Sequence, residues 1–343
     1  MASLPRRRLL IGAGALALAA CERRTTTVTT ARTPALDMDR LNREIGRIAR
    51  SVRPGVLGVG LMNLDTGEAF TFNGDRAFPM QSVFKAPLAA AVLAEVDAGR
   101  LSLETPVRLE EMDLSPWSPI AEAWPGLRDY TARDLLKAAV VDSDNTAADV
   151  LMARIGGPGA VTAWLNDKHV EAVRIDRYER ELQPEILGLP PFRPEWRNEA
   201  AFAAAWRAVP ADRQLRAVRA YLADRRDTAT PRGMLDFLSA LDSGAMVSPA
   251  SRRLLLQMMA GTATGAGQIK AGLPRGALLA HKTGVGPRVQ GVLSAINDVG
   301  IAILPDERRY AMAVFLAGST LAEGASGDAP IAAAARALIR GVR

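Results

Sequence analysis

The chain has 343 residues, of which 48% are hydrophobic and 23% are charged, and it carries a formal net charge of +6. The apolar content excludes a globally disordered chain, and the presence of only one apolar run near membrane length excludes a multi-spanning membrane protein. One cysteine and two histidines argue against disulfide scaffolds, cysteine-rich zinc modules and histidine metal sites, so neither a metal nor a cofactor is expected.

The first 36 residues have the pattern of an export signal followed by a tether. Arg6, Arg7 and Arg8 precede an apolar run over residues 9–20, which is short for a membrane span and typical of a signal peptide. The run ends in Leu-Ala-Ala-Cys21, which resembles a bacterial lipoprotein cleavage box. We therefore expect a signal peptide over 1–21, lipidation at Cys21 and a flexible tether over 22–36. An ordinary cleaved signal with an incidental cysteine, or a single-pass anchor, is the alternative.

Most of the basic charge lies in this segment. Residues 1–32 hold six arginines and one acid, Glu22, and so carry five of the six net positive charges. The charge therefore indicates export rather than a nucleic-acid surface, and the twin-arginine route is one candidate for that export. The expected location is the periplasm, with a membrane tether through Cys21 and no nucleic-acid partner.

Periodicity predicts a helix first, then two strands. Apolar residues recur at helical spacing over 36–52, and 56–64 and 69–72 have strand character around an Asp65-Thr66-Gly67 turn. Further helices are expected over 84–96, closed by Gly99, and over 130–156.

Strand signals return late in the chain, over 278–283, 291–297 and 310–316, before a final helix over 330–339. This order predicts an α+β fold in which a sheet domain is interrupted by a helical domain. The sheet part is expected over about 37–73 and 255–343, and the helical part over about 74–254.

Lysine is scarce in residues 33–343, and arginine supplies nearly all the positive charge of that part of the chain. A lysine can lose its proton in a desolvated site, whereas arginine cannot. Ser82 and Lys85, spaced three apart at the head of a predicted helix, would lie on one helical face, so the lysine could accept the hydroxyl proton. By itself this spacing is a weak signal, because most occurrences are a helix cap and a solvated charge.

Two further motifs follow in the chain. Ser143-Asp144-Asn145 could simply cap a helix, and Lys282-Thr283-Gly284 could simply end a strand. The order Ser-x-x-Lys, Ser-Asp-Asn and Lys-Thr-Gly is, however, the signature of class A β-lactamases and penicillin-binding proteins.

Residues 37–343 resemble a class A serine β-lactamase. Six segments occur in the family's order: FPMQSVFK, PWSPI, DSDNTAAD, IDRYERELQ, HKTG and NDVGIAILPDERRYAMAVF. The resemblance implies an antiparallel five-stranded sheet flanked by helices, an all-helical domain, and an active site at their interface.

The resemblance also implies roles for the acylation residues. Ser82 would be the nucleophile and Lys85 its general base or relay. Ser143 would pass a proton to the β-lactam nitrogen, and Lys282 would steady Ser143. Asn145 would bind the substrate's amide side chain.

Other family positions concern binding. Thr283, with Lys282, would attract the substrate carboxylate. The backbone N–H groups of Ser82 and Val285 would form the oxyanion hole. Trp117 would line the entrance, although a core tryptophan is the alternative.

The deacylation base is expected at Glu179, in Arg177-Tyr178-Glu179-Arg180-Glu181-Leu182-Gln183, which matches the family's Arg-x-Glu-x-x-Leu-Asn. Glu181 is a weaker candidate. Arg180 replaces the usual proline, and Gln183 replaces the asparagine that helps to hold the hydrolytic water. A water displaced by about 1 Å can lower the rate about a hundredfold, so restoring Asn at Gln183 should speed deacylation.

The Ω-loop is enlarged. Its closing stretch begins at Arg226, 43 residues after Gln183. Residues 184–225 contain two helical stretches, 200–209 and 215–222, which predict a helical hairpin. A tolerated surface insertion is the preferred interpretation, and a lid over the site is the alternative. Arg177 and Asp227 would pair at the loop neck.

The family's carboxylate-binding arginine is missing from both usual places, which align with Gln268 and with Gln290 or Gly291. Arg288 or Arg275 could substitute. His281 is expected to be structural, and His169 to lie on the surface.

The sequence thus predicts a monomeric hydrolase that opens the β-lactam amide bond through an acyl-serine intermediate. A D,D-peptidase or penicillin-binding protein with slow deacylation is the first alternative. A non-catalytic lipoprotein that senses cell-wall fragments or antibiotics is the second.

Overall fold

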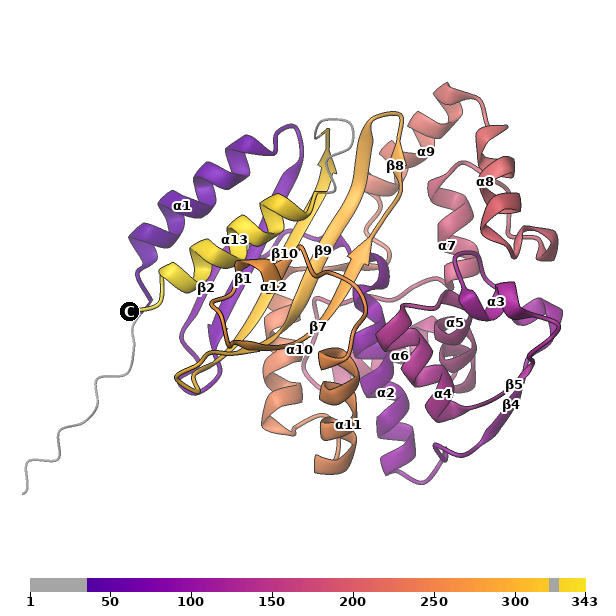
Figure 1. Ribbon diagram of the computed structural model, residues 1–343, viewed down its shortest axis with the longest axis horizontal. Helices are drawn as coiled ribbons and strands as arrows, with labels where there is room; N and C mark the ends of the chain where they lie inside the picture. Colours follow the sequence, from indigo (N-terminus) through magenta and orange to yellow (C-terminus); the bar gives the residue numbers. More distant parts are fainter. Residues whose placement is uncertain (1–35, 321–326) are drawn as a thin grey trace, which may run out of the picture. The chain divides into compact units, whose positions relative to one another are not determined.

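A five-stranded antiparallel sheet forms the centre of the structure, a computed structural model that describes residues 36–320 and 327–343 (Figure 1). The strand order is β2 (Ala69–Phe72), β1 (Val56–Asn63), β10 (Arg309–Ser319), β9 (Val292–Ile303) and β7 (Leu278–Val285). A short strand, β8 (Arg288–Val289), pairs with the start of β9. The predicted sheet is confirmed, and β9 extends six residues beyond the predicted strand end. The expected signal peptide, Cys21 and nearly all of the tether lie outside the described residues.

Helices cover both faces of the sheet, which explains why β9 and β10 are buried along almost their whole length. Val314 and Leu316 of β10 pack with helices α1 (Met38–Ser51) and α13 (Asp328–Arg340). Ala313 and Phe315, which point to the opposite face, join the core beneath the helical region. Figure 1 shows α1 and α13 side by side on one face.

The helical region occupies the middle of the chain. Its helices are η1 (Gln81–Phe84), α2 (Lys85–Asp97), η2 (Glu111–Asp113), α3 (Pro119–Ala123), α4 (Ala132–Lys137), η3 (Ala138–Asp142), α5 (Asn145–Arg154), α6 (Pro158–Asp167), α7 (Glu179–Ile186), η4 (Pro194–Trp196), α8 (Glu199–Arg207), α9 (Ala211–Ala223), α10 (Pro231–Ser243) and α11 (Pro249–Ala260). The short helix α12 (Ile269–Gly272) packs instead against α13, with Ile269 in the same apolar core. Two short antiparallel pairs join β3 (Phe78–Pro79) to β6 (Thr228–Ala229) and β4 (Pro106–Arg108) to β5 (Asp129–Thr131). The expected boundary at residues 254–255 falls inside α11.

The enlarged Ω-loop contains the predicted helical hairpin, formed by α8 and α9. Phe202 of α8 and Val218 of α9 are buried in a small apolar cluster with Leu187 and Val289. Since Val289 belongs to β8, the cluster joins the insertion to the sheet. Figure 1 shows α7, α8 and α9 grouped beside β8. The inserted segment is therefore packed into the molecule and is more than a surface excursion.

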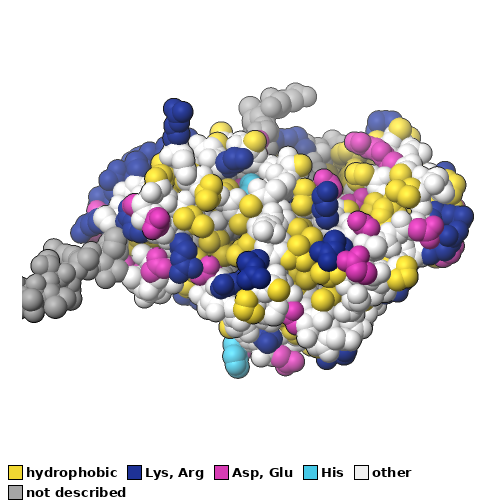
Figure 2. All heavy atoms as spheres, turned by 60° about the horizontal axis from the view of Figure 1, so that its bottom comes forward, with side chains coloured by type: hydrophobic (Ala, Val, Ile, Leu, Met, Phe, Trp, Pro, Cys, Tyr) yellow, Lys and Arg dark blue, Asp and Glu magenta, His cyan; other side chains and the backbone are white. Residues whose placement is uncertain are grey.

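Charge on the described surface is mixed. On the face drawn in Figure 2, Lys and Arg side chains lie interspersed with Asp and Glu. Among residues 36–320 and 327–343, no helix has both the length and the apolar character needed to cross a bilayer. In the same residues, no cluster of three or more His, Cys, Asp or Glu side chains could hold a metal ion.

Candidate active site

The Ser82 motif lies where strand β7 meets the head of helix α2. A Cβ atom on Gly284 of β7 would lie 2.4 Å from the Met80 carbonyl oxygen and 3.0 Å from the Val83 nitrogen, so only glycine permits this close approach. Asn297 of β9 adds hydrogen bonds to the carbonyls of Pro79 and Met80, at 2.8 and 3.0 Å. The sheet thereby fixes the turn that carries Ser82, which is partly exposed.

Lys85 is completely buried and connects three elements. Its Nζ atom donates to the Ser143 backbone oxygen at 2.6 Å and to Asn145 Oδ1 at 2.5 Å, and it lies 3.9 Å from Glu179 Oε1. Burial lowers the Lys85 pKa, although Glu179 and other nearby carboxylates oppose the shift. A buried lysine with a lowered pKa is suited to exchanging a proton.

The Ser143 motif interrupts the helix predicted over 130–156, and that prediction is therefore corrected. Ser143 adopts a left-handed conformation (φ 62°) between the π-helical turn η3 and helix α5. The break is stabilised by the buried Asp144 carboxylate, which accepts hydrogen bonds from Ser118 Oγ and from the backbone N–H groups of Ile120 and Ala147. Asn145 Nδ2 donates to the Pro116 oxygen at 2.9 Å.

Strand β7 brings Lys282 to this break. Lys282 Nζ donates to Ser143 Oγ and to the Thr283 backbone oxygen, both at 3.0 Å. Burial lowers the Lys282 pKa well below its usual value, and the positive charge of Lys85 adds to the shift. The Thr283 hydroxyl lies 2.5 Å from that of Thr264.

The remaining motif positions on β7 differ in exposure. Val285, at the end of this edge strand, is 54% exposed. His281 is buried, with Nδ1 2.8 Å from Asp298 Oδ1, which agrees with the structural role expected of it. His169 is exposed, as expected.

Glu179 begins helix α7 and is buried. The buried Asp149 carboxylate holds this helix end, because it accepts the backbone N–H of Glu179 at 2.7 Å and that of Arg180 at 3.0 Å. Arg180, which stands where the family has proline, also places Nε 3.2 Å from Asp149. Burial raises the Glu179 pKa, and the charge of Lys85 opposes the rise. Glu181 is exposed and accepts the Tyr178 N–H instead.

Gln183 lies one helical turn after Glu179, and its amide donates to Glu179 Oε2 at 2.5 Å. The same Nε2 atom donates to Gln81 Oε1 at 3.2 Å. Gln81 Nε2 donates in turn to the Tyr221 hydroxyl at 2.5 Å. Sequence reasoning missed Gln81, Asp149 and Tyr221, since their partners are distant in the chain; only the position of Gln81 beside Ser82 gave a signal.

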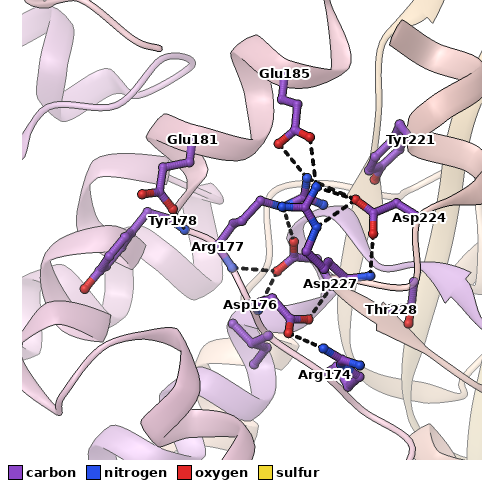
Figure 3. Close-up of polar contacts among 12 residues, drawn as sticks. Arg174, Asp176, Arg177, Tyr178, Glu181, Glu185, Tyr221, Asp224, Asp227 and Thr228 are labelled. Carbon is purple, nitrogen blue, oxygen red and sulfur yellow. Dashed lines mark hydrogen bonds and ion pairs between the residues drawn. The ribbon is translucent and has the colours of Figure 1, made fainter. Parts of the chain in front are cut away.

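The neck of the Ω-loop is closed as expected (Figure 3). Arg177 Nε and Asp227 Oδ2 lie 2.6 Å apart, and both side chains are buried. Arg177 also contacts Glu185 at 2.7 Å and Asp224 at 3.4 Å. These contacts join the start of α7 to the end of the insertion.

Trp117 and Gln290 contact the insertion. Trp117 meets Phe202 edge to face, with 5.1 Å between ring centroids. Gln290 donates to Gln214 of α9 at 2.8 Å, and Gln268 is buried. Neither glutamine supplies a positive charge.

Comparison with known proteins agrees with this geometry. Residues 40–342 match the model of the β-lactamase enzyme family. The chain is 30% identical to β-lactamase VEB-1 of Pseudomonas aeruginosa over 267 residues, which cover 77% of this chain and 78% of VEB-1. It superposes on a β-lactamase from Chitinophaga pinensis with a TM-score of 0.70 and 33% identity, covering 87% of this chain and 97% of the other.

A second similar structure is the class A β-lactamase of the last common ancestor of Gram-negative bacteria. Its TM-score is 0.70 and its identity 33%, with 88% of this chain and 98% of that chain covered. The motifs, the fold and these relatives lead to one conclusion: the chain belongs to the β-lactamase enzyme family, as a class A serine β-lactamase.

Proposed function

We propose that this protein hydrolyses the amide bond of β-lactams through an acyl-enzyme on Ser82. The observation that carries the proposal is the position of buried Lys85, within hydrogen-bond reach of the Ser143 loop and Asn145 and 3.9 Å from Glu179. One amine thereby joins the loop that carries Ser143, the candidate proton donor, to Glu179, the candidate base. The shared fold and the family's activity support the same reaction.

In acylation, Ser82 Oγ attacks the lactam carbonyl while Lys85 accepts the hydroxyl proton. The backbone N–H groups of Ser82 and Val285 stabilise the developing oxyanion. As the C–N bond breaks, Ser143 gives its proton to the ring nitrogen. The contact between Lys282 and Ser143 favours that transfer, because the ammonium stabilises the oxygen as it loses its proton.

In deacylation, ionised Glu179 takes a proton from a water molecule whose oxygen attacks the acyl carbonyl. Ser82 leaves with a proton and is regenerated, and the opened product departs. Glu179 and Gln183 each have a buried Oε1 atom without a hydrogen-bond partner among the described residues. Two acceptors suit the two O–H groups of one water.

Substrate binding uses side chains near these groups. Lys282 and Thr283 attract the substrate carboxylate, Asn145 binds the amide side chain, and Trp117 lines the entrance. The family's usual places for a carboxylate-binding arginine hold neutral Gln268 and Gln290, so Lys282 contributes to this attraction, with Arg288 or Arg275 as candidates for a second cation.

The test is nitrocefin turnover combined with mass spectrometry of the acyl-enzyme. Wild type should turn over, Ser82→Ala should form no adduct, and Glu179→Gln should accumulate one. Turnover slower than adduct formation by orders of magnitude in wild type would instead indicate a penicillin-binding protein. Absence of any adduct would indicate a non-catalytic binding protein.

We further propose that the enzyme is exported and works as a monomer on a lipid tether at Cys21. The lipoprotein-like box and the polar segment after it support this proposal. Labelling with a radioactive fatty acid should mark wild type but not Cys21→Ala, and the released protein should sediment as one chain. Equal labelling of both would contradict the tether.

A further inference from the structure

A hydrogen-bonded chain of three side chains leads from the insertion to the candidate general base. Tyr221 lies on α9, inside the segment that enlarges the Ω-loop, and Figure 3 shows it beside the loop neck. Its hydroxyl contacts Gln81, Gln81 contacts Gln183, and Gln183 contacts Glu179. All four side chains are buried, so water competes little for these hydrogen bonds.

The direction of the chain follows from the carboxylate at its end. Ionised Glu179 can only accept hydrogen bonds, so the Gln183 NH₂ group must face it. The second N–H of that group then requires an acceptor, which is Gln81 Oε1. This turns the Gln81 NH₂ group toward Tyr221, whose hydroxyl oxygen accepts. A flip of either amide would place two acceptors, or two donors, against one another.

The chain also orients the free end of Gln183. With both donors engaged, the Gln183 carbonyl oxygen is the atom left to bind a water beside Glu179. We propose that Tyr221 is a positioning residue for deacylation: it holds Gln81, and through Gln81 it holds the longer Gln183 side chain in the place that a shorter asparagine takes in the family. This inference rests on the proposed function.

Packing restricts both Tyr221 and Gln81. Its ring is buried with Leu182 and Ile186 of α7, the helix that carries Glu179 and Gln183. Gln81 has a left-handed backbone (φ 47°), which is unfavourable for a residue with a side chain, and its amide lies close to Gly286 of the segment after β7. The hydrogen bonds to Tyr221 and Gln183 hold the Gln81 side chain in place.

The experiment replaces Tyr221 with Phe, which keeps the ring and removes the acceptor. Single-turnover kinetics should show deacylation slowed on the order of tenfold, with acylation changed less than about twofold. Acyl-enzyme should therefore accumulate at steady state. Tyr310→Phe is the matched control, because Tyr310 is also buried but lies in β10 among the residues packed against α1 and α13. Both rates should be unchanged in it.

A double-mutant cycle separates positioning from a general loss of stability. In Gln183→Ala the chain is already cut, so adding Tyr221→Phe should slow deacylation no further. Additive effects would overturn the proposal, as would unchanged deacylation in Tyr221→Phe. If Tyr221→Phe folds poorly, Gln81→Met cuts the chain at its middle and must give the same selective slowing.

The proposed function fails on a different result. If Glu179→Gln traps no acyl-enzyme, Glu179 is not the deacylation base. If Glu179→Gln traps the adduct while Tyr221→Phe behaves as wild type, the reaction stands and only the role of Tyr221 falls.

Discussion

Arg177 and Asp227 lie 50 positions apart in the chain, yet their side chains meet in a buried ion pair with 2.6 Å between Nε and Oδ2. Asp227 also accepts the backbone N–H groups of Asp176 and Arg177, at 2.7 and 3.0 Å. The pair therefore fixes backbone as well as side chains in the segment just before α7.

Breaking this pair should destabilise the protein strongly. Arg177→Met leaves a buried carboxylate without its cation, for which a loss of about 3–5 kcal/mol of unfolding free energy is expected. Urea denaturation followed by circular dichroism measures it. Arg108→Met is the control, because the Arg108–Asp129 pair is exposed and should contribute at most about 1 kcal/mol. If both variants lose the same free energy of unfolding, the buried Arg177–Asp227 pair stabilises the protein no more than an exposed pair does.

The pH range over which the enzyme turns over β-lactams should be limited by Glu179 on the acid side and by Lys282 on the alkaline side. Burial raises the pKa of Glu179, so the ionised base is lost as pH falls through a value above that of an ordinary glutamate, and kcat declines there. Burial lowers the Lys282 pKa, so its charge is lost as pH rises through a value well below that of an ordinary lysine, and KM for anionic substrates increases.

Lys282→Arg provides the control for the alkaline side. An arginine stays protonated throughout the accessible range, so the alkaline rise in KM should move to higher pH or vanish, even if kcat is lower. If KM rises at the same alkaline pH in Lys282→Arg as in wild type, the rise is due to a group other than Lys282.

Installing the family's proline at Arg180 should harm this enzyme. Arg180→Pro removes the N–H that donates to Asp149 and also the guanidinium 3.2 Å from it. Because Asp149 is buried, the free energy of unfolding should fall by about 2 kcal/mol or more. Deacylation should also be slower, because α7 is less firmly held. Thermal unfolding and nitrocefin turnover check both effects.

A series of variants tests whether Arg180 acts through Asp149. Arg180→Ala keeps the N–H and should be intermediate, and adding Asp149→Asn to Arg180→Pro should recover stability because the unpaired charge is gone. If Arg180→Pro is as stable as wild type, Asp149 does not depend on Arg180.

Gln183→Asn should slow deacylation. From the sequence alone this change should bring the family's asparagine back and speed the step, but the amide of Gln183 spans Gln81 and Glu179 at once. A side chain shorter by one methylene cannot reach both acceptors. The fraction of acyl-enzyme at steady state should therefore rise, and a fall would support the sequence-based expectation.

The fold class and the three motifs could be predicted because both depend on local signals. Strand periodicity indicated the sheet, and the order of Ser82, Ser143 and Lys282 matched a known signature. The break at Ser143 could not be predicted, since it depends on Asp144 accepting hydrogen bonds from Ser118 and Ile120 of a different segment. The contact of Tyr221 with Gln81 joins residues 140 positions apart and leaves no local pattern.

The closed neck also explains how the loop can tolerate its length. For a loop whose ends are pinned, the entropy lost on closure grows only with the logarithm of its length, by roughly 0.6 kcal/mol for each doubling. The apolar cluster around Phe202 and Val218 offers burial that opposes this loss. The neck thus allows residues 184–225 to add two helices to the loop while Ser82, Lys85, Ser143 and Lys282, which lie outside the segment between Arg177 and Asp227, are held by other elements.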